Sequence, residues 1–244
     1  GATWHDTPGE VAAHSDLVIT IVGFPADVEA VYLGENGLVA RARPGTVLVD
    51  MTTSSPELAQ RIAAAAAERG VMALDAPVSG GEIGARDAKL SIMVGGSAEA
   101  FERALPVLRL MGPSVVLQGG PGSGQHTKLC NQIVIASTML GVAEGLAYAQ
   151  GAGLDADKVL ASITGGAAGS FLLSNMGPRM IKGDFTAGFF TEHFIKDMGI
   201  ALREAQRMKL DLPGLSTAKR LYDCLSAKGH ARDGTQVLFR HYQR

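Results

Sequence analysis

The chain has 244 residues, of which 46% are hydrophobic and 19% charged, with 31 glycines and a formal net charge of −2. This length supports one large or two modest domains with hydrophobic cores, and the composition excludes a disordered chain. The near-neutral charge and the absence of runs of like charge exclude a nucleic-acid-binding surface.

Cysteine usage and hydropathy set the expectations for the compartment. Cys130 and Cys224 lie far apart and match neither a metal-binding spacing nor a disulfide framework. We therefore predict no metal site and a reducing, cytoplasmic environment. The longest apolar stretches are interrupted by charge or glycine before they reach the length of a membrane span. Since no signal peptide is evident either, we expect no membrane partner.

Up to about Gly120, short apolar runs alternate with helical stretches. Buried strands are predicted over Leu17–Val22 and Thr46–Asp50, and helices over Ala26–Leu33 and from Pro56 to Arg69. Two more apolar runs, Val71–Leu74 and Leu90–Val94, flank a glycine-rich loop. Strands that are apolar throughout and separated by helices predict a parallel sheet covered on both faces.

Beyond Gly124 the pattern is helical throughout. Helices are predicted over Thr127–Gln150, Asp155–Ile163, Phe171–Ile181, Glu192–Lys209 and Leu215–Lys228. The fold class is therefore α/β followed by all-α, with a first domain over residues 1–121 and a second over 122–244. A long helix connects the two domains, and we expect a ligand in the cleft between them.

The loop Asp75–Gly96 is the most informative segment. Gly80-Gly81 lets the backbone approach a small molecule closely, because neither residue has a Cβ. Ser79 adds a hydroxyl donor, and consecutive N–H groups in such a turn favour an anion such as a carboxylate. The alternative is a tight strand-to-helix turn that binds nothing.

The segment Gly122–Gln132 opens the long helix. Lys128, Asn131 and Gln132 share one helix face by their spacing. On that face a lysine can donate a proton to a developing alkoxide, and an amide can orient the oxygen. The alternative is a solvated surface lysine. Of the neighbours, we expect His126 at the surface or hydrogen-bonded, and Cys130 in the core rather than acting as a nucleophile.

Lys196-Asp197 interrupts an apolar helix face. The pair is either an exposed ion pair of little energetic value or a lysine directed toward the expected cleft.

Together these three segments resemble the β-hydroxyacid dehydrogenase family, which includes 3-hydroxyisobutyrate dehydrogenases and tartronate semialdehyde (2-hydroxy-3-oxopropionate) reductases. The resemblance covers nearly the whole chain. It implies that Lys128 is the general acid and base and that Asn131 holds the substrate or the lysine. It also implies that the substrate, a small carboxylate-bearing aldehyde or hydroxy acid, is bound by Ser79, Gly80 and Gly81, with Gln132 nearby.

The resemblance also implies a cofactor, NAD or NADP, bound by Phe24, Pro25, Thr53 and Lys196. Glu29 matches a further cofactor position but differs in residue type. The long apolar helices carry Met139, Leu140 and Leu146, which suggests more hydrophobic surface than one copy buries. We therefore expect a homodimer or homotetramer formed through the helical domain.

One departure from the family concerns the nucleotide-binding turn. The family begins with a strand, a Gly-x-Gly-x-x-Gly turn and a helix that holds the pyrophosphate, and this sequence contains no such turn. It opens as the family does after its first βαβ unit, so we expect a truncated Rossmann-type domain lacking about forty residues. The strand over Leu17–Val22 would then have an unpaired, apolar edge.

The leading hypothesis is an NAD(P)-dependent oxidoreductase that interconverts a short 3-hydroxy acid and its semialdehyde. One alternative is a non-catalytic dehydrogenase-like module that acts in oligomerisation or ligand sensing. Another is a reductase of imines or of a different aldehyde on the same scaffold.

Overall fold

The protein is described here by a computed structural model that covers residues 1–243. It divides into two compact units, Gly1–Lys128 and Leu129–Arg244. The helix α7 (Ser123–Gly151) begins in the first unit and continues in the second.

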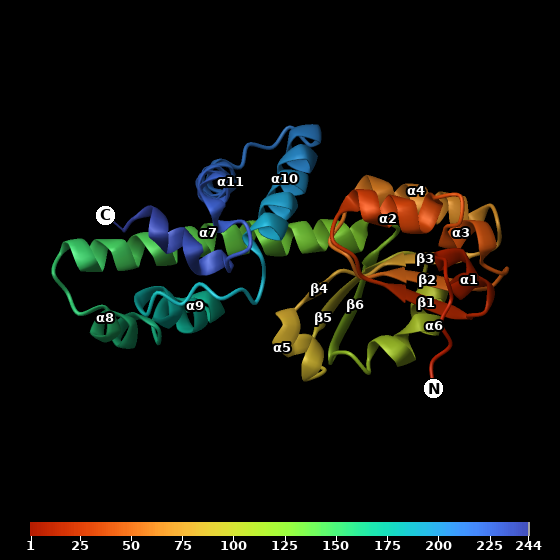
Figure 1. The fold of residues 1–244 in the computed structure, drawn as a ribbon, viewed down its shortest axis with the longest axis horizontal. Coiled ribbons are helices and arrows are strands. Elements are labelled where there is room, and N and C mark those ends of the chain that lie inside the picture. The colour runs from red at the N-terminus through yellow and green to blue at the C-terminus, as the bar shows by residue number, and fades with distance from the viewer. Residues whose placement is uncertain (244) are drawn as a thin grey trace. The chain divides into compact units, whose positions relative to one another are not determined.

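The first unit is an α/β domain with a six-stranded sheet (Figure 1). Its strands are β1 (Leu17–Thr20), β2 (Val47–Asp50), β3 (Met72–Asp75), β4 (Val78–Ser79), β5 (Ser91–Gly95) and β6 (Ser114–Gly119). Its helices before α7 are α1 (Pro8–Ala13), α2 (Pro25–Leu33), α3 (Leu38–Arg41), α4 (Pro56–Ala67), α5 (Gly81–Arg86) and α6 (Ala98–Leu108).

The sheet is mostly parallel. The strands β1, β2 and β3 pair in parallel in chain order, and β5 pairs in parallel with β6. The sequence analysis predicts a parallel sheet, but β5 runs antiparallel to both β3 and β4. The difference arises because the chain after β3 turns back through β4 and the short α5, without the long crossover that a parallel return requires.

Both faces of this sheet are covered, as predicted. Successive side chains of a strand point to opposite faces, and β2 shows this directly. Leu48 belongs to a core with helices α1 to α4, whereas Val47 and Val49 belong to a second core with α6. Alternate residues of one apolar strand thus supply both cores.

The sequence signals that predict the start and end of α4 act over a few residues, and the structure confirms them. Ser55 caps α4, its Oγ accepting the N–H of Leu58 at 3.1 Å, and Pro56 occupies the first helical position. The chain leaves α4 through Gly70, whose φ of +68° lies in the left-handed region that favours glycine.

Within the described residues β1 is an edge strand of the sheet, paired only with β2. Ile19 is partly exposed there, and Ile21, just beyond the strand, is 67% exposed. The predicted unpaired apolar edge is therefore present, and such an edge favours pairing with another strand.

The second unit is all-helical, as predicted. It contains the rest of α7 followed by α8 (Ala156–Ile163), α9 (Phe171–Ile181), α10 (Thr191–Arg207) and α11 (Pro213–Leu225), with a π-helical turn over Ser226–His230 and a 3-10 helix over Thr235–His241. Its core includes Met139 and Leu146 of α7, Phe194 of α10 and Tyr222 of α11, with the ring centroids of Phe194 and Tyr222 5.3 Å apart.

Two expectations about α7 are corrected. Cys130 is exposed, not in the core, because it follows the buried Leu129 and one residue turns the helix by about 100°. In addition, α7 is long and apolar enough, by length and composition, to cross a membrane. The core helix of a water-soluble protein passes the same test, and α7 contributes Ala136, Met139 and Ala143 to the core of the second unit.

Candidate functional site

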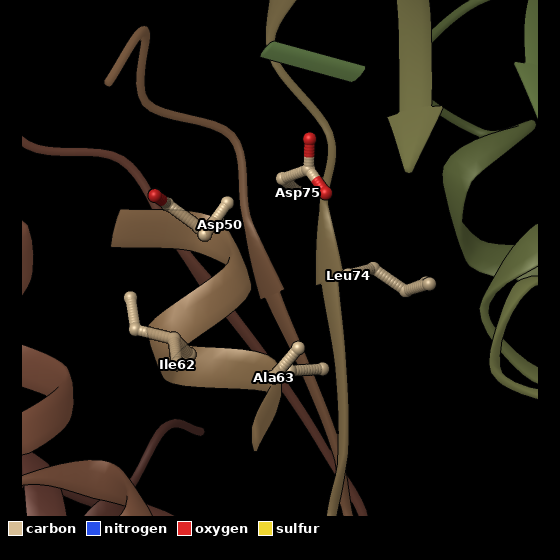
Figure 2. Close-up of a pocket in the computed structure, with 7 residues that line it drawn as sticks. Asp50, Ile62, Ala63, Leu74 and Asp75 are labelled. Atoms are coloured by element: carbon tan, nitrogen blue, oxygen red, sulfur yellow. The ribbon is translucent and has the colours of Figure 1, made fainter. Parts of the chain in front are cut away.

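The carboxyl ends of three parallel strands carry a row of polar side chains. Thr20 of β1 is the register partner of Asp50 of β2, and Asp50 is the register partner of Asp75 of β3. Figure 2 shows both aspartates at the ends of their strands. Ligands of open α/β sheets bind at this edge.

Asp50 ties the first two strand ends together. Its Oδ1 accepts the N–H of Thr52 at 3.0 Å and the hydroxyl of Thr20 at 3.3 Å. The hydroxyl of Thr52 in turn accepts the N–H of Val22 at 2.9 Å. Burial raises the pKa of Asp50 to about 6, although the hydrogen bonds from Thr52 and Thr20 oppose the rise.

Asp75 holds the beginning of α7. Its Oδ1 accepts the N–H of Gly122 and its Oδ2 the N–H of Gln125, both at 2.8 Å. The first N–H groups of a helix have no partner within the helix, so a carboxylate from another element can cap them. Burial raises the pKa of Asp75 to about 6, against the effect of these N–H groups.

A small cavity lies beside the two carboxylates. It has a volume of about 10 Å³, which is about the space of one water molecule. Asp50 and Asp75 line it on one side, and Ile62 and Ala63 of α4 on another (Figure 2). The cavity is too small for an organic substrate.

Gln125 connects α7 to the loop after β2. The side chain is fully buried, donates from Nε2 to the carbonyl of Thr52 at 2.8 Å and accepts the N–H of Ser54 at 2.9 Å. These two bonds flank Thr53, the residue expected at the nicotinamide. Phe24 and Pro25, the other expected cofactor residues, lie at the start of α2, where Phe24 is 40% exposed.

The glycine-rich segment after β4 takes the form of a strand-to-helix turn. Ser79 ends β4 and is the register partner of Ser91 in β5. Gly80 and Gly81 follow with φ values of +133° and +62°, so both need the conformational freedom of glycine. The space where a Cβ of Gly81 would stand is open.

Lys128 is almost fully buried at 7% exposure, so the alternative of a solvated surface lysine is wrong. It lies on α7 after Gln125, in the same compact unit as Ser79, Thr53 and Phe24.

In the second unit, three more predicted residues form one network with Asp197 that is partly to fully buried. Asn131 donates from Nδ2 to Oε1 of Gln132 at 2.7 Å, and Gln132 donates from Nε2 to Oδ2 of Asp197 at 2.6 Å. The Nζ of Lys196 lies 3.0 Å from Oδ1 of Asp197. The Lys196 and Asp197 side chains are only 12% and 1% exposed, so the alternative of an exposed ion pair is wrong.

Sequence reasoning missed the roles of Asp50, Asp75 and Gln125. A signal was available for the aspartates, since each ends an apolar strand and a charge at that edge is costly unless it is hydrogen-bonded. No comparable signal marks Gln125. Within residues 1–243, no cluster of three His, Cys, Asp or Glu side chains is placed to hold a metal ion.

Comparison with known families gives a consistent result. The model of the NAD binding domain of 6-phosphogluconate dehydrogenase matches residues 1–120. The model of the NAD-binding region of NADP-dependent 3-hydroxyisobutyrate dehydrogenase matches residues 122–242.

Individual relatives cover almost the whole chain. An uncharacterized oxidoreductase of Bacillus subtilis is 56% identical over 240 residues, which are 98% of this chain and 83% of that protein. The 2-hydroxy-3-oxopropionate reductase of Escherichia coli is 41% identical over 229 residues, 94% of this chain and 78% of that protein. Among solved structures, a Mycobacterium tuberculosis 3-hydroxyisobutyrate dehydrogenase with L-serine superposes with a TM-score of 0.90 at 31% identity, covering 98% of this chain and 84% of that one.

Proposed function

Because the chain belongs to the family of 3-hydroxyisobutyrate dehydrogenases and 2-hydroxy-3-oxopropionate reductases, which are NAD(P)-dependent oxidoreductases, we propose that it interconverts a short 3-hydroxy acid and its semialdehyde. The observation that carries this proposal is the burial of Lys128 on α7, in the same unit as Ser79.

In the proposed mechanism, Lys128 handles the proton. In the reduction, its ammonium group donates a proton to the carbonyl oxygen as that oxygen becomes an alkoxide. In the oxidation, the neutral amine accepts the hydroxyl proton. A lysine removed from water suits this role, because its proton is exchanged with the substrate rather than with solvent.

The substrate carboxylate is assigned to the turn Ser79-Gly80-Gly81. The two glycines let backbone N–H groups approach an anion, and the Ser79 hydroxyl adds a donor. Asn131 and Gln132 complete the proposed site. Since the amide of Gln132 is already bonded to Asn131 and Asp197, its contribution is to orient the Asn131 amide.

The strand ends of the first unit fit the nicotinamide half of the cofactor. The hydrogen bonds of Gln125 fix the loop that carries Thr53, and Phe24, at the start of α2, is a partly exposed aromatic residue. We assign Phe24, Pro25, Thr53 and Lys196 to cofactor binding. When bound, the nicotinamide would supply or accept the hydride.

The names of the relatives suggest the substrate class. Reduction of 2-hydroxy-3-oxopropionate at its aldehyde gives glycerate. 3-Hydroxyisobutyrate, L-serine and glycerate all contain a hydroxymethyl group next to a carbon that bears a carboxylate. They differ only in the third substituent, which is a methyl, an ammonium or a hydroxyl group. We therefore propose a substrate of this type.

Lys128→Ala tests the proposal. Initial rates are measured with each of the three acids and NAD or NADP, and in reverse with tartronate semialdehyde and NADH or NADPH. In a chain that includes the dinucleotide-binding turn, the substitution is expected to abolish steady-state turnover and leave cofactor affinity largely unchanged. Lys158→Ala, which removes an exposed lysine of the second unit, is the control and is expected to keep full activity. Full turnover by Lys128→Ala would contradict the proposal.

We also propose assembly as a homodimer or homotetramer through the helical unit. Val134 and Tyr148 of α7 are 65% and 78% exposed, and Phe171 at the start of α9 is 73% exposed. Large exposed apolar side chains in one unit favour burial against another copy. Light scattering coupled to size-exclusion chromatography measures the mass directly, and a monomer at micromolar concentration would contradict this assignment.

A further inference from the structure

The start of α7 is held by a side chain that the proposed mechanism does not use. Asp75 belongs to β3, yet its two carboxylate oxygens accept the N–H groups of Gly122 and Gln125. Gln125 precedes Lys128 by three positions, which is less than one helical turn and about 4.5 Å of helical rise. The carboxylate thus fixes the turn of α7 from which Lys128 projects.

The Asp75 carboxylate and the start of α7 approach each other closely, and two glycines make this approach possible. A Cβ at Gly95 would lie 2.5 Å from Oδ1 of Asp75 and 2.6 Å from the N of Gly124. A Cβ at Gly124 would lie 2.5 Å from the carbonyl oxygen of Asp75 and 2.9 Å from its Oδ2. Two glycines are therefore needed for the carboxylate to reach the helix, and real Cβ atoms do not tolerate such distances.

The same residue also leads directly into the substrate loop. After Asp75, at the end of β3, the chain passes through Ala76 and Pro77 into β4, which ends at Ser79. The Asp75 side chain therefore joins the segment that leads into the proposed carboxylate-binding turn to the helix that carries the proposed acid. Both lie in the first compact unit.

We propose that Asp75 is a positioning residue for the reaction, which caps α7 from β3 and thereby sets the place of the Lys128 amine relative to the Ser79 turn. This inference rests on the proposed function. A purely structural Asp75 would affect only the stability of the fold. A positioning Asp75 affects the reaction rate, and it does so only through the place of the Lys128 amine.

Asp75→Asn is the first test, because it keeps the shape of the side chain and replaces one accepting oxygen by a donor. Steady-state kinetics are measured with whichever of the three acids gives the highest kcat/KM. We expect kcat to fall about 10- to 100-fold, because small displacements of reacting groups cost this much, while KM changes less than about threefold. An unchanged kcat would overturn the inference.

Ser97→Ala is the matched control. Ser97 caps α6 in the same unit, its Oγ accepting the N–H of Ala100 at 3.2 Å, but α6 carries no proposed catalytic residue. It is expected to lower the unfolding temperature and leave kcat unchanged. An equal loss of kcat in both variants would attribute the effect to general destabilisation and overturn the inference.

A double-mutant cycle separates this inference from the proposed function. In the Lys128→Ala background, the residual single-turnover rate is expected to be the same with and without the Asp75→Asn substitution, since the position of an absent amine cannot matter. Rate losses that multiply would overturn the inference alone. Full turnover by Lys128→Ala would instead overturn the proposed function and the inference with it.

Backbone amide exchange in the unsubstituted protein covers the case in which Asp75→Asn does not fold. The N–H groups of Gly122 and Gln125 are expected to be strongly protected from exchange although they begin a helix. Exchange at the rate of open amides would show that the cap is absent and overturn the inference.

Discussion

The side-chain amide of Gln132 donates to the Asp197 carboxylate across 2.6 Å, and this bond joins two segments of the second unit that sequence reasoning treated separately. Gln132 belongs to the Lys128 motif on α7, and Asp197 to the Lys196 pair on α10. Asp197 is 1% exposed. A buried carboxylate is tolerated only when its oxygens are paired, so the two motifs depend on each other.

Gln132→Leu would remove the donor to Asp197 and the acceptor of the Asn131 amide. We expect a loss of about 2 kcal/mol in the free energy of unfolding, the usual cost of a broken hydrogen bond to a buried charge. Urea denaturation measures this. Thr138→Ala on the same helix is the control: its hydroxyl bonds only to the carbonyl of Val134, and the expected loss is below about 0.5 kcal/mol. Equal losses would mean that the Gln132–Asp197 bond contributes no more to the free energy of unfolding than the exposed Thr138 bond does.

Asp50→Asn is expected to change how stability depends on pH. The pKa of Asp50 is about 6 in the folded protein against 3.8 for the ordinary group. Between these values the folded state retains a proton that the unfolded state has lost. The contribution of Asp50 is therefore fully present below about pH 4 and is lost as the pH rises through 6.

The size of this effect follows from the shift. At about 1.4 kcal/mol per pKa unit, it amounts to about 3 kcal/mol. The free energy of unfolding of Asp50→Asn, relative to the unsubstituted protein, should increase by this order between about pH 4 and pH 7. A difference that stays flat over this range would show that the Asp50 carboxyl does not keep its proton in the folded protein at these pH values.

Local signals in the sequence located most of the elements. The cap and proline at Ser55-Pro56 and the apolar stripe of α7 each act within a few residues, so they can be read from the sequence alone. The antiparallel β5 was not predicted, because its direction depends on pairing with β4 and β3 across a loop. Pairing between distant segments leaves no periodic trace.

In the candidate site, too, local sequence motifs predict some residues, whereas contacts between distant segments are not predictable. The predicted roles of Lys128, Ser79 and Lys196 rest on motifs of adjacent residues. The side chains that hold them in place were not predicted, because Asp75 reaches α7 across 47 positions of the sequence and Gln132 reaches Asp197 across 65. Such contacts are set by the fold and not by local composition.

The 244 residues contain no Gly-x-Gly-x-x-Gly turn, the element that holds the pyrophosphate of a dinucleotide in Rossmann domains. We therefore expect these residues, expressed by themselves, to bind NADH and NADPH more weakly than micromolar. Titration followed by the fluorescence of the reduced nicotinamide measures both affinities. Micromolar binding of either cofactor would mean that the strand ends of β1 and β2 suffice.

Gly124→Ala and Gly145→Ala, both on α7, are expected to change the free energy of unfolding in opposite directions. A Cβ at Gly124 would lie closest to the carbonyl oxygen of Met93 in β5 and 2.5 Å from that of Asp75 in β3, whereas a Cβ at Gly145 would meet no atom within 4 Å. Because both oxygens belong to the backbone, relief requires α7 to move away from β3 and β5. We expect Gly124→Ala to cost more than about 2 kcal/mol in the free energy of unfolding.

Gly145→Ala should instead stabilise the protein by up to about 1 kcal/mol, because alanine favours a helix interior over glycine. Thermal and urea denaturation of the two variants provide the comparison. If Gly124→Ala were as well tolerated as Gly145→Ala, the close contact of the start of α7 with Met93 and Asp75 would be absent in solution. If Gly145→Ala were the destabilising one, the open face of α7 at Gly145 would be covered by another copy of the chain.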